Sequence, residues 1–313
     1  MSYQIAKIAG VPIKVHWTFG LLLLFVLHVA YSNNYGLQDT LWYISIVLIV
    51  FVFVIMHEFG HIFVARKYGV NTKDVIVSPI GGVARLLSMP RDPKKELFIA
   101  IGGPAVNIFL AIILLIILFV FFDFAVPEDD RLNLISKPGE YLTILLFINV
   151  ALVAFNMIPA FPMDGGRVFR ALLTKILNSR LKATFIASVV GQLLAVVFLF
   201  AGKYFEHYML MLIGVFIFFM ARREYRQAKL EDKLDQTKVS DIMKPVDSIE
   251  QAMKEMAQGT IPQHLSLSQA FEVLSKFGWY KAIVYGHDNL PIGYVDRPTL
   301  MAFIDNNRGR GLF

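Results

Sequence analysis

Long apolar stretches alternate with short charged segments along the first 222 residues of the chain. A helix needs roughly 20 apolar residues to cross about 30 Å of hydrocarbon, and the range extends down to about 17. Stretches close to this length cover residues 16–31, 41–65, 97–122, 141–158, 184–201 and 208–221. The pattern therefore predicts about six transmembrane helices.

The residues 76–87 are apolar as well, but Pro79, Gly81 and Gly82 interrupt them. A proline and two glycines argue against a spanning helix and favour a re-entrant segment or a β-hairpin. The predicted fold class is thus a multi-pass α-helical membrane protein that contains a short re-entrant β-like segment.

Charge is distributed unevenly over the segments between the predicted spans. Lys and Arg precede the first span, separate the second from the third and the fourth from the fifth, and follow the sixth. The segment 32–40 has neither, and the segment after the third span is acidic, with Asp123, Glu128, Asp129 and Asp130. Cytoplasmic loops of membrane proteins are rich in Lys and Arg, so both termini are expected in the cytoplasm.

Composition agrees with a membrane protein and excludes several other classes. The chain has 313 residues, of which 56% are hydrophobic and 17% charged, with a mean hydropathy of +0.58. Topology accounts for the net charge of +6, and no basic stripe remains to suggest a nucleic-acid partner. Cysteine is absent, which excludes disulfides and thiolate metal sites. Residues 1–14 lack the pattern of a cleavable signal, so we expect the first span to be retained.

Hydropathy falls sharply after Arg222, which divides the chain. We predict a membrane domain over residues 1–222, a charged linker over 223–238 and a small cytosolic α/β domain over 239–313. Within this last part the pattern predicts a helix at Ser268–Phe277 and two strands at Lys281–Tyr285 and Ile292–Val295.

Two histidines and a glutamate interrupt the end of the second apolar stretch, in the sequence His57-Glu58-Phe59-Gly60-His61. Residues four apart share one face of a helix, so His57 and His61 present two imidazoles together. Two imidazoles suit zinc, and a neighbouring carboxylate can take a proton from an attacking water. Ionisable groups within an apolar span are costly, and they are functional-site candidates for that reason. The segment therefore predicts a hydrolytic metal centre.

A hydrolytic zinc site needs a third protein ligand, and Asp164 is the candidate. It lies where two prolines and two glycines break the end of the fourth apolar stretch, and such backbone is tolerated at membrane depth where it lines a cavity. The alternative is an ordinary helix end with an Asp-Gly turn.

These motifs resemble those of the site-2 protease family of intramembrane zinc metalloproteases. That family carries His-Glu-x-x-His in one span and an Asn-Pro-x-Pro-x-Asp-Gly type motif in a later one. Here the second motif is matched by Pro159 to Gly165, with Asn156 shortly before it and a slightly different spacing. The segment from Gly102 to Asn107, which includes Gly103 and Pro104, resembles the family's Gly-Pro-x-x-Asn segment.

The resemblance implies roles for these residues. His57, His61 and Asp164 would bind one zinc ion and Glu58 would act as general base. The substrate would be a transmembrane segment of another protein. Gly102 and Gly103 would let helices approach closely and Asn107 could hydrogen-bond across the bundle, although helix packing alone would also explain them. The segment around Pro79, Gly81 and Gly82 could offer an edge strand to the substrate.

The C-terminal part resembles a CBS module, as found in the prokaryotic branch of the family, which points to a prokaryotic plasma membrane. Such modules work in pairs, and the chain after Val239 has room for little more than one. A second copy of the chain would complete the pair and imply a homodimer. Asp296 lies where the family's nucleotide-contacting pattern is expected, so a dimerisation or substrate-docking role is preferred to binding of adenine nucleotide.

Two other functions remain open from the sequence. An inactive relative could bind membrane partners without cutting them, but it would keep four costly polar residues for no purpose. A metal transporter would spread ionisable groups along a pathway, whereas the first, third, fifth and sixth spans have almost none. Cobalt or manganese could also occupy two imidazoles and a carboxylate.

Overall fold

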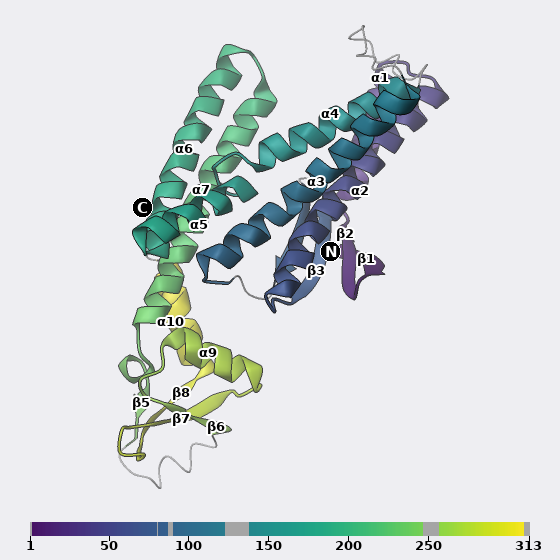
Figure 1. Ribbon diagram of the computed structural model, residues 1–313. Helices are drawn as coiled ribbons and strands as arrows, with labels where there is room; N and C mark the ends of the chain where they lie inside the picture. The colour runs from purple at the N-terminus through teal and green to yellow at the C-terminus, as the bar shows by residue number, and fades with distance from the viewer. Residues whose placement is uncertain (1, 80, 87–89, 123–137, 247–256, 310–313) are drawn as a thin grey trace.

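The chain forms a bundle of long helices, a small sheet beside it and an α/β module at the C-terminal end (Figure 1). The computed structural model describes residues 2–79, 81–86, 90–122, 138–246 and 257–309. The predicted acidic segment, with Asp123, Glu128, Asp129 and Asp130, lies outside the described residues, as do Ile80 and Leu87 of the predicted hairpin.

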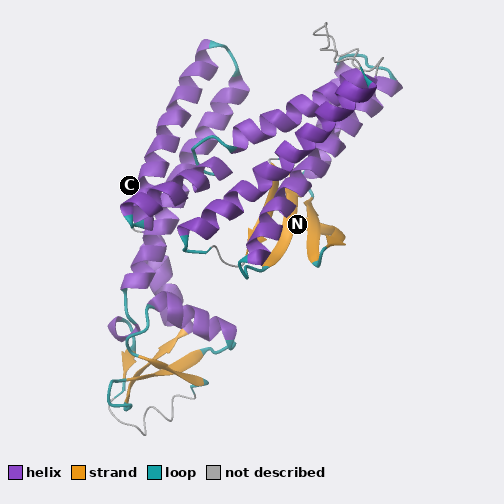
Figure 2. Cartoon of the chain, in the orientation of Figure 1, coloured by secondary structure: helices purple, strands orange, loops and turns teal. Residues whose placement is uncertain are grey.

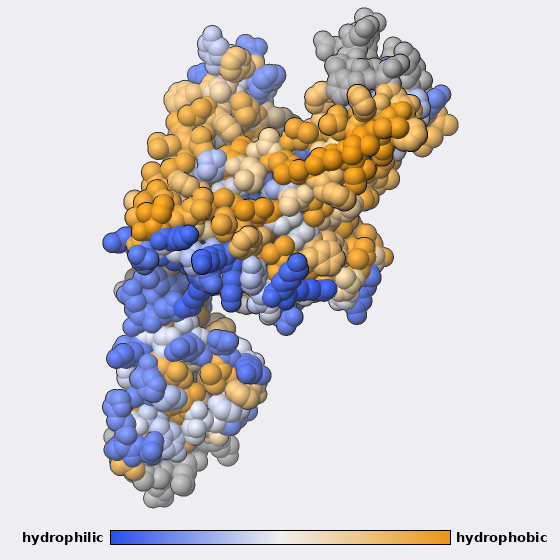
Figure 3. All heavy atoms as spheres, viewed as in Figure 1, coloured by the Kyte–Doolittle hydropathy of each residue, from blue (hydrophilic) through white to orange (hydrophobic). Residues whose placement is uncertain are grey.

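Four described helices are long and apolar enough to cross a membrane, which confirms a membrane protein. They are α2 (Leu37–Lys67), α3 (Pro93–Phe121), α4 (Pro138–Asn156) and α6 (Arg180–Tyr204). The first predicted span corresponds to α1 (Phe19–Ser32), which has only 14 residues. The sixth corresponds to the apolar first half of α7 (Tyr208–Gln236), a helix that continues into charged sequence. On the face shown in Figure 3, mostly apolar residues cover the helical bundle, and hydrophilic residues gather where α7 leaves it.

The predicted hairpin is present and belongs to a larger sheet (Figure 2). Strands β3 (Thr72–Ser78) and β4 (Gly81–Leu86) pair antiparallel, β2 (Val11–His16) pairs parallel with β3, and β1 (Ser2–Ile8) pairs antiparallel with β2. The order β1-β2-β3-β4 leaves β4 at one edge. Alternate valines and isoleucines of β2 and β3 pack on Phe59 and Ile62 of α2.

The N-terminal strands were not predicted, and the predicted start of the first span was wrong. His16 ends β2, and α1 begins three residues later at Phe19. Residues 1–14 mix charged and apolar positions, and the strand pattern is broken by an irregular register in β1. The short alternation therefore gave too weak a signal to separate a hairpin from a polar leader.

The chain between α4 and α5 (Asp164–Leu177) turns sharply over Met157–Met163. Helix α5 was not predicted, because its first residues Gly165 and Gly166 and the preceding prolines indicate a loop. A Cβ on Gly165 would collide with the backbone of Met157 and Ile158, and one on Gly166 would lie 2.7 Å from the Ala160 carbonyl carbon. The two glycines are therefore needed for the loop to fold back onto the start of α5.

Helices α2 and α3 are in backbone contact where Gly60 faces Gly102. A Cβ on Gly102 would lie 2.7 Å from the Gly60 carbonyl oxygen, closer than real Cβ contacts come. The predicted close approach through Gly102 is thus confirmed. This contact brings the histidines of α2 against α3.

The C-terminal part contains a second sheet, with strand order β5-β8-β7-β6. The predicted helix and strands are present as α9 (Leu267–Lys276), β7 (Lys281–Tyr285) and β8 (Pro291–Asp296). Around them lie η1 (Val239–Asp241), β5 (Lys244–Pro245), β6 (Gly259–Pro262) and α10 (Arg297–Gly309). Helices α9 and α10 contact α7, so the last turns of α7 carry the module.

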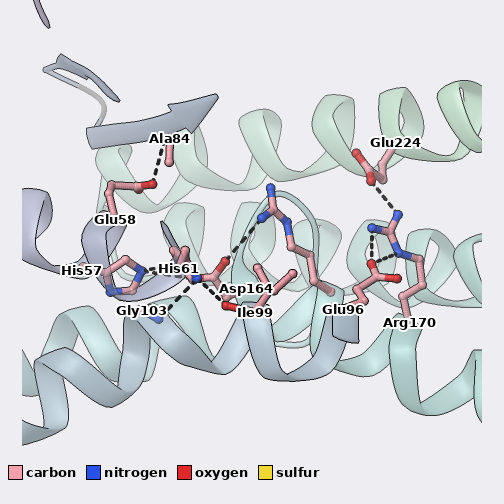
Figure 4. A network of polar contacts seen from close by, with 11 residues as sticks. His57, Glu58, His61, Ala84, Glu96, Ile99, Gly103, Asp164, Arg170 and Glu224 are labelled. Atoms are coloured by element: carbon pink, nitrogen blue, oxygen red, sulfur yellow. Dashed lines mark hydrogen bonds and ion pairs between the residues drawn. The ribbon is translucent and has the colours of Figure 1, made fainter. Parts of the chain in front are cut away.

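A buried arginine joins three helices of the bundle. Arg170 of α5 donates to Glu96 of α3 at 2.8 Å and to Glu224 of α7 at 2.6 Å (Figure 4). The side chains of Arg170 and Glu96 are 4% and 1% exposed. Removal of one partner from such a pair leaves a buried charge without compensation, which is strongly destabilising.

We predict that Arg170→Gln lowers the free energy of unfolding by about 3–5 kcal/mol, because Glu96 is left buried and uncompensated. The matched control is Arg91→Gln, which removes the ion pair with Asp235 at an arginine that is 66% exposed, and should cost about 0–1 kcal/mol. Denaturant unfolding of both variants in detergent measures the difference. Equal losses would show that the buried cluster does not hold the three helices together.

Candidate metal centre

Two histidines of α2 and the first residue of α5 converge inside the helical bundle (Figure 4). The Nε2 atoms of His57 and His61 lie 3.1 Å apart. Each also lies 3.1 Å from Oδ2 of Asp164. All three residues are buried, at 5%, 5% and 7% exposure. The structure thus brings the two predicted histidines together with the predicted third ligand, which lies more than a hundred residues after them in the sequence.

The hydrogen bonds around His61 fix which of its nitrogens is free to bind. Its Nδ1 lies 2.7 Å from the carbonyl oxygen of Ile99, and a carbonyl can only accept, so Nδ1 carries the proton. The Gly103 N–H lies farther from the same nitrogen, at 3.3 Å. Nε2 of His61 therefore presents a lone pair toward Asp164, the arrangement that metal-binding histidines use.

The donor set fits a zinc ion. Tetrahedral zinc with bonds of about 2.0–2.1 Å places its ligand atoms about 3.3–3.4 Å apart, close to the three spacings here. A Cβ on Gly103 of α3 would lie 2.5 Å from Nε2 of His57 and would collide with Nε2 of His61 as well, so only glycine leaves this side of the pair clear. Among the described residues, His57, His61 and Asp164 are the one group that could hold a metal.

Asp164 is positioned by its place at the N-terminus of α5. The N-terminal end of a helix carries partial positive charge and favours a carboxylate there. The second oxygen, Oδ1, lies 4.0 Å from Nη1 of Arg167, one turn further along the helix. One carboxylate oxygen thus faces the histidines and the other faces a cation, so the side chain presents a single ligand atom to the pair.

Glu58 lies between the histidine pair and the sheet. Its Oε2 accepts a hydrogen bond of 2.8 Å from the backbone N–H of Ala84 in β4 (Figure 4). A Cβ on Gly82 would lie 2.9 Å from Val54 and 3.0 Å from Cγ of Glu58, so β4 passes very close to α2. The sheet thereby forms one wall of the site.

A charged cluster on the sheet holds β4 in this position. Asp74 of β3 accepts from Arg85 of β4 at 2.6 Å and from Lys14 of β2 at 2.7 Å. The bond from Arg85 is the main reason that the pKa of Asp74 falls to about 2. Asp74 therefore stays ionised at neutral pH and ties three strands together.

His57, Glu58, His61 and Asp164 line a cavity of about 440 Å³. Its walls come from α2, α3, α4, β4, the loop before α5, the start of α5, and α7, which contributes Phe216, Met220 and Glu224. Most of the other lining residues are apolar or glycine, as in small-molecule and substrate sites.

The supporting residues named from the sequence are divided between this cavity and its surroundings. Asn107 and Asn156 line the cavity, and so do Gly81 and Gly82. Pro79 is exposed at the hairpin turn. Gly102, Gly103 and Pro104 are buried in α3, and Pro159 lies in the loop before α5. The predicted hydrogen bond from Asn107 across the bundle is not found among the described residues, where both atoms of its amide lack a partner.

Sequence reasoning missed the backbone groups of the site. The carbonyl of Ile99 and the N–H of Ala84 orient His61 and Glu58. Backbone atoms are common to all residues and leave no signal in the sequence. Arg167 could have been identified, since it lies three residues after Asp164 at the start of a basic segment.

Comparison with known proteins shows which family the chain resembles. Residues 45–137 and 135–201 match the model of peptidase family M50. The zinc metalloprotease MJ0392 of Methanocaldococcus jannaschii is 39% identical over 244 residues, which are 78% of this chain and 66% of that protein, just under two thirds of its length. The Synechocystis protein sll0528 is 27% identical over 314 residues, or 93% of this chain and 75% of that protein.

A solved structure has a similar fold. The site-2 protease from Methanocaldococcus jannaschii superposes with a TM-score of 0.54 at 37% identity, covering 72% of this chain and 95% of that one. The family model covers half of this chain, and the relatives named above are zinc metalloproteases by name. The chain therefore belongs to peptidase family M50, the site-2 protease family of zinc metalloproteases.

Proposed function

We propose that this chain is an intramembrane zinc endopeptidase, which hydrolyses peptide bonds within or near the transmembrane segments of other proteins. One observation carries the proposal: three ligand atoms lie 3.1 Å apart beside Glu58, in a cavity within apolar helices. Ionisable groups are costly in such surroundings, and a metal centre gives each of them a use.

The residues of the site have two roles, metal binding and proton transfer. His57, His61 and Asp164 would hold the ion, which supplies Lewis acidity and a water of lowered pKa when bound. Glu58 takes the proton from the water that attacks the carbonyl carbon. It then passes this proton to the amide nitrogen as the C–N bond breaks. The cavity wall and the apolar helices keep other water away from the reacting groups.

The substrate is proposed to enter as an extended segment. A peptide bond inside a transmembrane helix is already hydrogen-bonded and dry, so the helix must unwind before water can attack. Strand β4 is an edge strand that lines the cavity beside Glu58, and it could pair with such a segment by β-addition. The glycines at its start, Gly81 and Gly82, leave room for a second backbone there.

The proposed topology has six spans, namely α1, α2, α3, α4, α6 and the apolar half of α7. Both termini then lie in the cytoplasm of a prokaryote, with the metal centre near the cytoplasmic end of α2. The basic segments Arg66–Lys73 and Arg222–Lys229 support this orientation. The domain limits proposed are 1–222, 223–238 and 239–313.

The C-terminal module is proposed to act as half of a CBS-like pair that forms a homodimer. Asp296 is already engaged within its own chain, since Oδ1 accepts from the Thr299 N–H at 2.8 Å and Oδ2 from Lys244 at 3.0 Å. Burial raises the pKa of Asp296, but these bonds outweigh it and lower the pKa overall. A carboxylate used in this way supports a docking role for the module rather than binding of adenine nucleotide.

We predict that Glu58→Gln lowers cleavage of a co-expressed membrane substrate by about 10²–10⁴-fold, because the amide cannot accept the proton. Zinc content should stay at that of the wild type, since the ligand atoms are untouched. Immunoblotting of the substrate together with metal analysis of the purified protein measures both. Equal cleavage by the two proteins would refute the protease function, and zinc without cleavage in either would favour a silent partner-binding relative.

We also predict that Gly103→Ala displaces the two Nε2 atoms and lowers the bound zinc well below the wild-type level. The matched control is Gly20→Ala in α1, where a Cβ would meet nothing within 4 Å. Metal analysis after purification at matched zinc concentration is the measurement. If both variants keep wild-type zinc, the ion does not lie against this face of α3.

A further inference from the structure

At alternate residues, the outer edge of β4 presents to the cavity backbone groups that are not paired with β3. Ala84 donates to Glu58 of α2, so its N–H points away from the partner strand β3. Backbone groups alternate in direction along a strand, so those of Gly82 and Leu86 point outward as well. All three residues line the cavity that contains the metal centre.

One of these outward donors is already occupied by the residue that we assign as the general base. Oε2 of Glu58 accepts the Ala84 N–H at 2.8 Å, the length of a charge-assisted hydrogen bond. The bond joins α2 to the sheet directly beside His57. As long as it persists, the Glu58 carboxylate is held against the strand.

An extended substrate on β4 would need the same N–H. An added strand pairs through the outward N–H and C=O groups of every second residue, and Ala84 lies at the middle of the three. One N–H cannot serve a carboxylate and a substrate carbonyl at full strength. When substrate docks, the Ala84 N–H therefore exchanges one acceptor, the Glu58 carboxylate, for another, a substrate carbonyl.

We propose that the Ala84 N–H holds Glu58 until an extended substrate backbone takes over this donor, so that the base is released only for chains that pair with β4. The inference rests on the proposed function and adds a rule for specificity. A segment that stays helical, or a peptide too short to pair with Ala84, leaves Glu58 on the strand. Ala84 acts through its backbone as a positioning residue.

The test removes this N–H from the zinc-loaded full chain in lipid nanodiscs. Replacement of the Ala84 amide by an ester exchanges the N–H for an oxygen that cannot donate, with little change in backbone geometry, and Ala84→Pro is the genetic counterpart. The matched control is the same ester at Leu86, which also lies on the outward edge but is not bonded to Glu58. Two substrates are compared, a transmembrane peptide with its flanks and a short fluorogenic peptide that ends before it could pair with Ala84.

With the ester at Ala84, kcat/KM for the short peptide should rise on the order of tenfold, as expected when one hydrogen bond to a charged group is removed. For the transmembrane peptide it should fall, because a strand bond is lost. The Leu86 ester should lower kcat/KM for the transmembrane peptide only. A fall for both substrates at unchanged zinc, or no change for the short peptide, would overturn the proposal, since either result makes the Ala84 N–H a purely structural contact.

A second measurement does not depend on catalysis. Hydrogen exchange at the ¹⁵N-labelled Ala84 amide should be faster in Glu58→Ala than in the wild type, and addition of the transmembrane peptide to that variant should slow it again. Exchange that stays fast with bound peptide would overturn the inference. If the wild type cuts neither substrate but the amide responds in this way, the proposed protease function fails and the exchange of acceptors stands.

Discussion

The convergence of His57, His61 and Asp164 is the constraint on which the rest of the membrane part depends. Burial of three such groups among apolar helices is unfavourable unless they are paired or bind a metal. Their Nε2 and Oδ2 atoms lie 3.1 Å apart, and this spacing requires close contacts between the helices and the loop that carry them. Gly60 and Gly102 let α2 and α3 touch, Gly103 leaves room at the imidazoles, and Gly165 and Gly166 let the loop fold against α5.

The ion pairs of Arg170 fix the position of α5, the helix that carries Asp164. Asp164 and Arg170 lie on the same helix, six residues apart, and Arg170 is held by α3 on one side and α7 on the other. Helix α5 therefore cannot shift without straining either the third ligand or the buried ion pairs. Glu224 of α7 also lines the cavity, so the helix that carries the C-terminal module reaches the wall of the site.

Sequence reasoning predicted the parts of this arrangement that depend on side chains at regular spacing. The i, i+4 histidines share a helix face wherever the helix forms, and an aspartate on a broken, proline-containing segment was the natural third ligand. Helix α5 was missed because its glycines are required by a close approach of backbones, which the pattern cannot distinguish from a turn. Strands β1 and β2 were missed because β2 is stabilised by Phe59 and Ile62 of α2, a contact between segments far apart in the sequence.

The contact between Glu58 and Ala84 shows how one feature can meet two physical demands. An exposed edge strand is a template for unwanted pairing, and proteins protect such edges with charged groups among other means. Here the Glu58 carboxylate protects the edge of β4 at Ala84, where the proposed substrate would pair with the strand. That carboxylate is also the proposed base, so it cannot protect the strand and act in catalysis at the same time. Selectivity for extended chains then follows from the Ala84 N–H, the donor that Glu58 and the substrate share.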